Sequence, residues 1–167
     1  MFKSINPRDI AQNPFSLIGD DWGLVTAGAA DSLNTMTVSW GGVGIMWNKP
    51  AAFIFIRPQR YTFEFLERGD CFSLCFFDEE YRKALAFCGS KSGRDVDKVK
   101  ETGLTPAFTD GGVPYFEEAK LVLVCKKLYG QFLNADGVTD EAVVAPNYSG
   151  DDYHKMYIGE IVQVLSK

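Results

Sequence analysis

The chain has 167 residues, 46% of them hydrophobic, including 13 Phe, 7 Tyr and 3 Trp. This apolar content can fill the core of one compact domain, which excludes an intrinsically disordered chain. The formal net charge of −5 argues against a nucleic-acid partner, because such proteins need a basic face. No segment approaches the roughly 20 apolar residues of a membrane span, and none of signal-peptide length follows Met1. We therefore expect a cytoplasmic protein without a membrane partner.

In chain order, the hydrophobic pattern predicts a short helix at 7–12 and then strands at 22–29, 34–40 and 51–56. A helix at 62–68, a strand at 71–77 and helices at 79–88 and 95–101 follow. Strands at 121–125 and 157–165 complete the chain. We expect Thr62 and Asp78 to be helix N-caps, and Gly89 to lie just past the end of the helix at 79–88.

Three of the predicted strands are apolar at successive positions, namely AAFIFI at 51–56, CFSLCFF at 71–77 and LVLVC at 121–125. This pattern is typical of strands that are covered on both faces. Many strands with a few short helices predict a mainly β fold, a β-barrel with short helices. Regular βαβ alternation is missing, so a Rossmann sheet is not favoured. No repeat or linker divides the chain, which predicts a single domain over 1–167.

The sequence gives little support for metal or hydrolytic chemistry. Its four cysteines form no Cys-x-x-Cys pair, and we expect buried free thiols rather than a metal site or a disulfide. It also has no Gly-x-Ser-x-Gly elbow, no P-loop and no Gly-x-Gly-x-x-Gly motif. His154 is the only histidine, beside two aspartates at 151 and 152. It either borders an active site or lies on a solvent-facing loop.

A strand followed by glycines is the first candidate binding motif. It runs through Asn34, Thr35, Met36, Thr37, Val38, Ser39 and Trp40, and Gly41, Gly42 and Gly44 follow. Such a strand can offer backbone N–H groups to the edge of a flat ligand, and glycines allow a close approach. The alternative is a hairpin in which the glycines only serve the turn.

Two further segments carry cations. Arg57-Pro58-Gln59-Arg60-Tyr61-Thr62 places two guanidinium groups just before a predicted helix N-terminus, an arrangement that favours a phosphate monoester. The alternative is a solvated loop whose arginines pair with surface acids. Cys88-Gly89-Ser90-Lys91-Ser92-Gly93-Arg94 combines cations, hydroxyls and free amides that suit an anion or a polar ring edge. It could equally be an ordinary connection between helices.

Together and in this order, these segments resemble the flavin reductase-like family of FMN-binding split β-barrels, and within it the flavoredoxin branch. The matching stretches are NTMTVSW at 34–40, AAFIFIRPQRYTFEFL at 51–66, FCGSKSGRDVDKVKETGLTP at 87–106 and YIGEIVQV at 157–164. The resemblance covers nearly the whole chain. The sequence departs from commoner members at Lys49-Pro50, where a double proline often precedes the strand, and in its aromatic Trp40 and Trp47.

The resemblance implies a homodimer that binds FMN non-covalently. Residues Asn34 to Trp40 would contact the isoalloxazine ring and the ribityl chain. The phosphate end would lie at Arg57, Arg60, Tyr61 and Thr62, and the loop from Cys88 to Arg94 would close over the flavin. No metal is implied, and no catalytic residue is assigned beyond His154 as a candidate, because the flavin performs the chemistry.

The function that this resemblance implies is that of a flavin-dependent oxidoreductase. It would move hydride or electrons between NAD(P)H, or a redox protein, and an acceptor through the bound FMN. An FMN-binding carrier or sensor domain without turnover of its own would need the same binding site and remains an alternative. A purely structural β-barrel is a third interpretation, and it would purify without colour.

Overall fold

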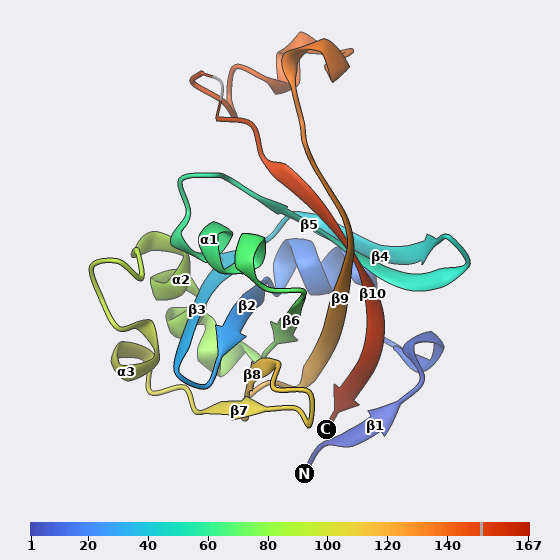
Figure 1. Cartoon of the computed structure of the whole chain (residues 1–167), viewed down its shortest axis with the longest axis vertical. Helices are drawn as coiled ribbons and strands as arrows, with labels where there is room; N and C mark the ends of the chain where they lie inside the picture. Colours follow the sequence, from blue (N-terminus) through green and yellow to red (C-terminus); the bar gives the residue numbers. More distant parts are fainter. Residues whose placement is uncertain (151) are drawn as a thin grey trace.

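The computed structural model describes residues 1–150 and 152–167, and its fold is mainly β (Figure 1). Antiparallel pairing gives one 8-stranded sheet in the order β3-β2-β6-β9-β10-β5-β4, with β1 paired to β10; β7 and β8 form a separate small sheet. The strands are β1 Lys3–Ile5, β2 Gly23–Ala29, β3 Ser32–Val38, β4 Gly41–Met46, β5 Lys49–Ile56, β6 Cys71–Phe76, β7 Pro106–Phe108, β8 Pro114–Phe116, β9 Leu121–Phe132 and β10 Lys155–Ser166. The helices are α1 Tyr61–Arg68, α2 Arg82–Ser90 and α3 Lys98–Thr102.

The two edge strands of the large sheet, β3 and β4, follow one another in the chain but do not pair. Only Ser39 and Trp40 separate them, so the sheet curls into a barrel that is split between these strands. β4 returns to β5 through a two-residue turn at Trp47 and Asn48, whose φ values of 50° and 62° are those of a type I′ hairpin. The β9–β10 pair extends beyond the barrel, and residues 133–150 and 152–154 of its connection form the tip (Figure 1).

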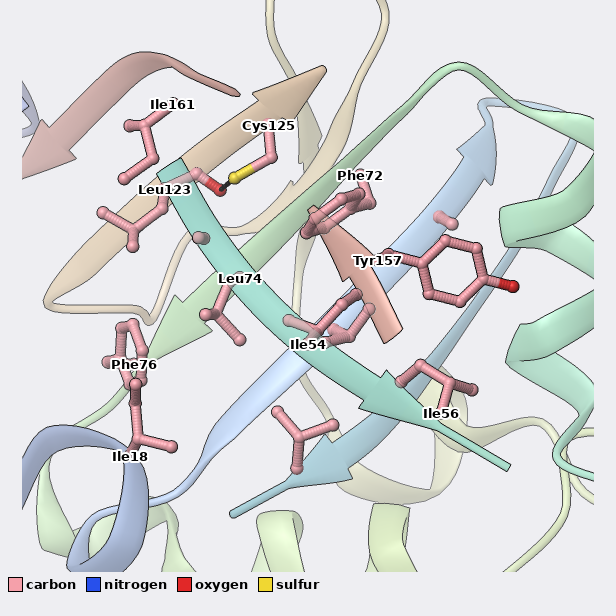
Figure 2. Packing of buried hydrophobic residues seen from close by; sticks show 14 of the residues in the cluster. Ile18, Ile54, Ile56, Phe72, Leu74, Phe76, Leu123, Cys125, Tyr157 and Ile161 are labelled. Atoms are coloured by element: carbon pink, nitrogen blue, oxygen red, sulfur yellow. Dashed lines mark hydrogen bonds between the residues drawn. The ribbon is translucent and has the colours of Figure 1, made fainter. Parts of the chain in front are cut away.

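Buried side chains form two clusters on the opposite faces of the central strands. The inner cluster fills the barrel and includes Ile54, Phe72, Leu74 and Tyr157 (Figure 2). The outer cluster lies beneath α2, α3 and the β7–β8 sheet. Alternate residues of β6 and β9 enter different clusters, because successive side chains point to opposite faces of a strand. The prediction of strands covered on both faces is therefore confirmed for β6 and for the first half of β9. It is wrong for β5, whose Phe53 and Phe55 remain half-buried on the face away from the barrel interior.

The predicted strands are present, but several ends differ. β9 continues to Phe132, seven residues past the predicted end, and the predicted strand at 34–40 ends at Val38. The glycines after Trp40 belong to strand β4 rather than to a turn. Gly41 is required there by its φ of 145° and by the backbone oxygen of Phe53, which would lie 2.3 Å from a Cβ atom.

The predicted helix caps are mostly wrong. α1 begins at Tyr61, one residue before the expected cap Thr62, whose hydroxyl instead accepts a hydrogen bond from Asn34. Asp78 precedes a 3₁₀ turn and makes no side-chain cap bond. Gly89 lies within α2, where the missing side chain allows close packing against Thr37. The helix expected at 95–101 begins at Lys98, because Asp97 caps its first turn.

No helix in the described part of the chain has the length and apolarity to span a membrane.

Candidate functional site

Two adjoining cavities lie where the end of β3 meets the β5–α1 connection and the α2–α3 loop. The first, here called the strand-edge cavity, has a volume of about 310 Å³ and is lined by Met36 to Trp40, Phe55 and His154 among others. The second, here called the cationic cavity, has a volume of about 240 Å³. Met36, Arg57 and Arg60 line both, so the two cavities are parts of one groove.

The cationic cavity has a strongly biased lining. Its residues are Met36, Arg57, Gln59, Arg60, Tyr61, Thr62, Ser90, Lys91, Ser92, Gly93 and Lys98. Four of these are cations and none is an acid, in a chain whose net charge is −5. Hydroxyl groups of Thr62, Ser90 and Ser92 add hydrogen-bond donors. This combination favours a compact anion such as a phosphate monoester.

Lys98 is the residue that the sequence analysis did not assign. It is only 6% exposed, and its ammonium donates hydrogen bonds of 2.8 Å to the carbonyl oxygens of Thr35 and Cys88. These bonds join β3 to α2 and use two of the three ammonium protons. Burial lowers the pKa of Lys98 and the nearby Arg60 lowers it further, although the Cys88 thiol opposes the effect. An anion in the cavity would stabilise the protonated form.

Arg60 is held at the mouth of the same cavity. Its guanidinium donates to the carbonyl oxygen of Gly89 at 3.1 Å and forms no ion pair within residues 1–150 and 152–167. It is the N-cap residue of α1, in an extended conformation, so the helix N-terminus and the guanidinium charge lie together. Both features favour an anion.

Asn34 of β3 makes tight contacts with α1 and with the α2–α3 loop. Asn34 is buried and donates from Nδ2 to the hydroxyl of Thr62 at 2.8 Å. Its Oδ1 would lie 2.0 Å from a Cβ atom at Gly93, so only glycine fits there. Asn34 therefore positions the hydroxyl and the loop that line the cavity.

The open edge of β3 supplies backbone groups to this region. Among the described residues β3 pairs with β2 alone, and the carbonyl of Thr35 points away from β2, toward Lys98. The N–H and C=O of a residue in an antiparallel strand point to the same side, and the side alternates along the strand. The backbone groups of Thr37 therefore face away from β2 as well. Such an unpaired edge can hydrogen-bond the edge of a planar ligand.

The sequence model of the flavin reductase like domain matches residues 17–167. The chain belongs to the flavin reductase-like family. A comparison with curated proteins gives no significant match.

Solved structures show the same split-barrel fold as this flavin reductase-like chain. An FMN-binding domain of a flavin reductases-like enzyme from Shewanella baltica has a TM-score of 0.72 at 15% identity, over 99% of this chain and 77% of that one. Flavoredoxin of Desulfovibrio vulgaris has a TM-score of 0.69 at 22% identity, over 100% and 77%. Flavoredoxin from Methanosarcina acetivorans has a TM-score of 0.70 at 20% identity, over 88% and 68%.

Most of the residues proposed from the flavin reductase-like resemblance line the groove, including those from Met36 to Trp40 and from Ser90 to Gly93. Others lie behind its wall. Cys88 is buried in the outer cluster, and burial raises the pKa of its thiol to about 11, which leaves it uncharged near neutral pH. Arg94 pairs with Glu64 and lies over the ring of Tyr61. Asn34, Thr35, Cys88, Gly89 and Arg94 are the proposed residues outside the two linings.

Arg57 is engaged by the β9–β10 connection. Its guanidinium forms an ion pair of 2.7 Å with Asp152, donates to the carbonyl oxygen of Asn147 and lies over the ring of Tyr148. Arg57 therefore holds this connection against the groove. Its charge is already paired, which makes Arg60 and Lys98 the better candidates for an anion.

His154 lines the strand-edge cavity from the end of the β9–β10 connection, where it is half-buried just before β10. Its ring lies 4.9 Å from the ring of Trp40, and Tyr148 is hydrogen-bonded to Nδ1 at 2.7 Å. Burial lowers the pKa of His154 to about 4, with Arg57 adding to the effect and Asp152 opposing it. The imidazole is therefore neutral near neutral pH and held in one orientation beside the cavity.

Proposed function

We propose that this chain binds FMN non-covalently in the groove and acts as a flavin-dependent oxidoreductase. The observation that carries the proposal is a cavity with four cations and no acid, adjoining an unpaired strand edge in a chain of net charge −5. Membership of the flavin reductase-like family supports it, as does the similarity to an FMN-binding domain of known structure.

The residues present fit FMN. Arg60, Lys91 and Lys98 would hold the phosphate together with nearby hydroxyl groups, because none of these three cations pairs with a carboxylate of the described residues. Asp152 neutralises only Arg57 at the edge of the cavity. The segment from Met36 to Trp40 would hold the planar ring through its backbone and side chains. Gly93 lets the loop approach Asn34 closely enough to shape the cavity between these two ends.

When bound, FMN supplies hydride and electron transfer. The chain would orient it through the strand edge, with Trp40 and Asn147 beside the ring end. His154, neutral and fixed by Tyr148, would hydrogen-bond a substrate or the ring at the wall of the strand-edge cavity. NAD(P)H or a redox protein would be the electron donor. Oxidation of NADH or NADPH with ferricyanide as acceptor measures turnover, and a chain that binds FMN without this activity would be a carrier.

We also propose a homodimer. Ile45, Trp47 and Tyr129 are large apolar residues with 40–54% of their surface exposed, and the rings of Trp47 and Tyr129 lie 6.2 Å apart. The β4–β5 hairpin and the β9–β10 arm thus present one apolar patch, of the kind that a second copy would cover.

Loss of the Arg60 guanidinium tests the proposed site. We expect Arg60→Ala to weaken FMN binding by about 1.5–3 kcal/mol, or roughly ten- to 150-fold, because one charge-assisted contact is removed. The affinity of Arg60→Ala for riboflavin, which lacks the phosphate, should be close to that of the unmodified protein. The matched control is Arg68→Ala, at the exposed end of α1 and outside both cavities. Equal FMN affinity of Arg60→Ala and the unmodified protein would remove Arg60 from the site.

A further inference from the structure

A third cavity, of about 440 Å³, lies between the projecting arm of β9–β10 and its connection; we call it the aromatic cavity. It is lined by Trp40, Gln131, Phe132, Leu133, Asn134, Gly137, Val138, Val143, Val144, Asn147, Tyr148, Tyr153 and Met156. The arm and its connection are the part of the chain that extends furthest from the barrel in Figure 1. The chemistry of the lining indicates what the cavity could bind.

The lining carries no charged side chain, in contrast to the cationic cavity. Aromatic rings and aliphatic groups form most of the wall, and the centroids of the Tyr148 and Tyr153 rings lie 4.5 Å apart with a tilt of 30° between the ring planes. The polar groups are the neutral amides Gln131, Asn134 and Asn147, together with the tyrosine hydroxyls. Flat aromatic walls favour a planar ring, and neutral amides can hydrogen-bond a carbonyl or hydroxyl group.

An ionic ligand would be disfavoured in such a cavity. A charge that leaves water without a partner of opposite sign meets a large desolvation cost. The nearest cation of the groove, Arg57, is already paired with Asp152. The aromatic cavity therefore selects against the anions that the cationic cavity favours.

The position of the cavity connects it to the groove. Trp40 and Asn147 line both the aromatic cavity and the strand-edge cavity. A ligand in the aromatic cavity would thus contact side chains that also line the proposed ring site. A second substrate bound there would lie next to the proposed ring site.

We propose that the aromatic cavity binds an uncharged, planar aromatic compound that carries a carbonyl or hydroxyl group, beside the ring end of the groove. This assigns a substrate class to the redox function proposed above and rests on that function for its catalytic meaning. The binding itself depends only on the cavity.

The test uses two probes with the same ring system, 2-acetonaphthone and 2-naphthoate, which differ in that the second carries a carboxylate. Their affinities are measured by calorimetry on the full chain, with and without FMN. We expect the uncharged ketone to bind at least tenfold more tightly than the carboxylate. Equal or tighter binding of 2-naphthoate would overturn the proposal, because the ligand would then be following the cations of the groove.

A matched pair of variants locates the ligand. Val143 lines the aromatic cavity and is 54% exposed, whereas Val162 is 53% exposed on β10 and outside the cavity lining. Val143→Asp should weaken 2-acetonaphthone binding at least tenfold, and Val162→Asp should leave it unchanged. Unchanged binding by Val143→Asp would contradict the proposed location. FMN titration of Val143→Asp distinguishes this proposal from the proposed FMN site. We expect the variant to bind FMN with the affinity of the unmodified chain, because Val143 lies outside the groove. That result holds even if 2-acetonaphthone does not bind in the aromatic cavity.

Discussion

Lys98 is the side chain that most clearly favours an anion site, rather than an ordinary loop, at the α2–α3 connection. Its buried ammonium connects β3 to α2 and has no carboxylate partner in the described residues. A buried cation without a counter-ion is costly to a folded protein. Such a residue is expected where a ligand supplies the missing negative charge.

We predict that Lys98→Met weakens FMN binding roughly tenfold or more and lowers the free energy of unfolding by about 1–3 kcal/mol, because two buried carbonyls lose their donor. FMN titration and urea denaturation measure the two effects. Lys100→Met, an exposed position on the same helix, should change neither. Lower stability with unchanged FMN affinity would make Lys98 a purely structural residue.

His154 gives a pH dependence with a defined sign. Its pKa in the folded chain is about 4, against an ordinary value of 6.5. Between these values, the unfolded chain binds a proton that the folded chain does not, so the free energy of unfolding decreases as the pH falls through this window. The decrease is at most about 1.4 kcal/mol per pH unit, and less here because the half-buried ring is screened by solvent.

We predict that His154→Gln loses less stability than the unmodified chain between pH 6.5 and pH 4. Urea denaturation at several pH values measures the difference, and the carboxylates that titrate in both proteins cancel in the comparison. Identical pH profiles would show that folding leaves the pKa of the His154 imidazole unchanged, which contradicts the burial of its ring.

The residues of the site were only partly predictable from sequence. Arg60 and Thr62 could be assigned to the candidate site because cations and a hydroxyl lie at the start of a predicted helix. Lys98 could not, because a lysine four residues after Arg94 looks like any exposed lysine until the fold buries it. The pairing of Arg57 with Asp152 joins residues 95 positions apart, and no local pattern reports such a contact.

At the scale of elements, the turn from β3 into β4 defines the ring end of the groove. We predict that Gly41→Ala lowers the free energy of unfolding by about 1–3 kcal/mol from backbone strain alone, because its φ is 145° and a Cβ atom would lie 2.3 Å from the Phe53 oxygen. Gly42→Ala is the control, since a Cβ atom there meets nothing within 4 Å. Urea denaturation of both variants measures the effect. Equal stability of the two would mean that the β4–β5 pairing adapts to a side chain at position 41.

How well an element could be predicted from sequence depended on how its residues are buried. The strands covered on both faces, such as β6, were recognised because their apolar runs leave little alternative. β4 was missed as a strand because three of its six residues do not favour one: Gly41, Gly42 and Gly44. The outer half of β9 was missed because its residues project beyond the barrel and are exposed, so they need no apolar pattern.

At the scale of the whole molecule, the apolar patch of Ile45, Trp47 and Tyr129 is left 40–54% exposed by the described residues. We predict that the protein is a dimer and that Trp47→Glu makes it a monomer, because a carboxylate at the centre of an apolar interface is desolvated without a partner. Size-exclusion chromatography with light scattering measures the mass. Phe15→Glu, which replaces a residue 86% exposed on the N-terminal segment, is the control. If Trp47→Glu remains a dimer that is as stable as the Phe15→Glu dimer, the interface does not include Trp47.

The mainly β barrel itself was predictable, because short strands with few helices limit the possible architectures. The split between β3 and β4 was not predicted from composition or periodicity, since it depends on which strands stay unpaired after the sheet curls. That unpaired edge, next to a cavity lined by cations, is the arrangement on which the proposed function depends.

A calorimetric titration of the full chain with FMN and, separately, with riboflavin tests this arrangement most directly. We predict that FMN saturates one site per chain and binds at least tenfold more tightly than riboflavin, because only FMN brings a phosphate to Arg60 and Lys98. No heat of binding with FMN, or equal affinities for the two compounds, would contradict the account.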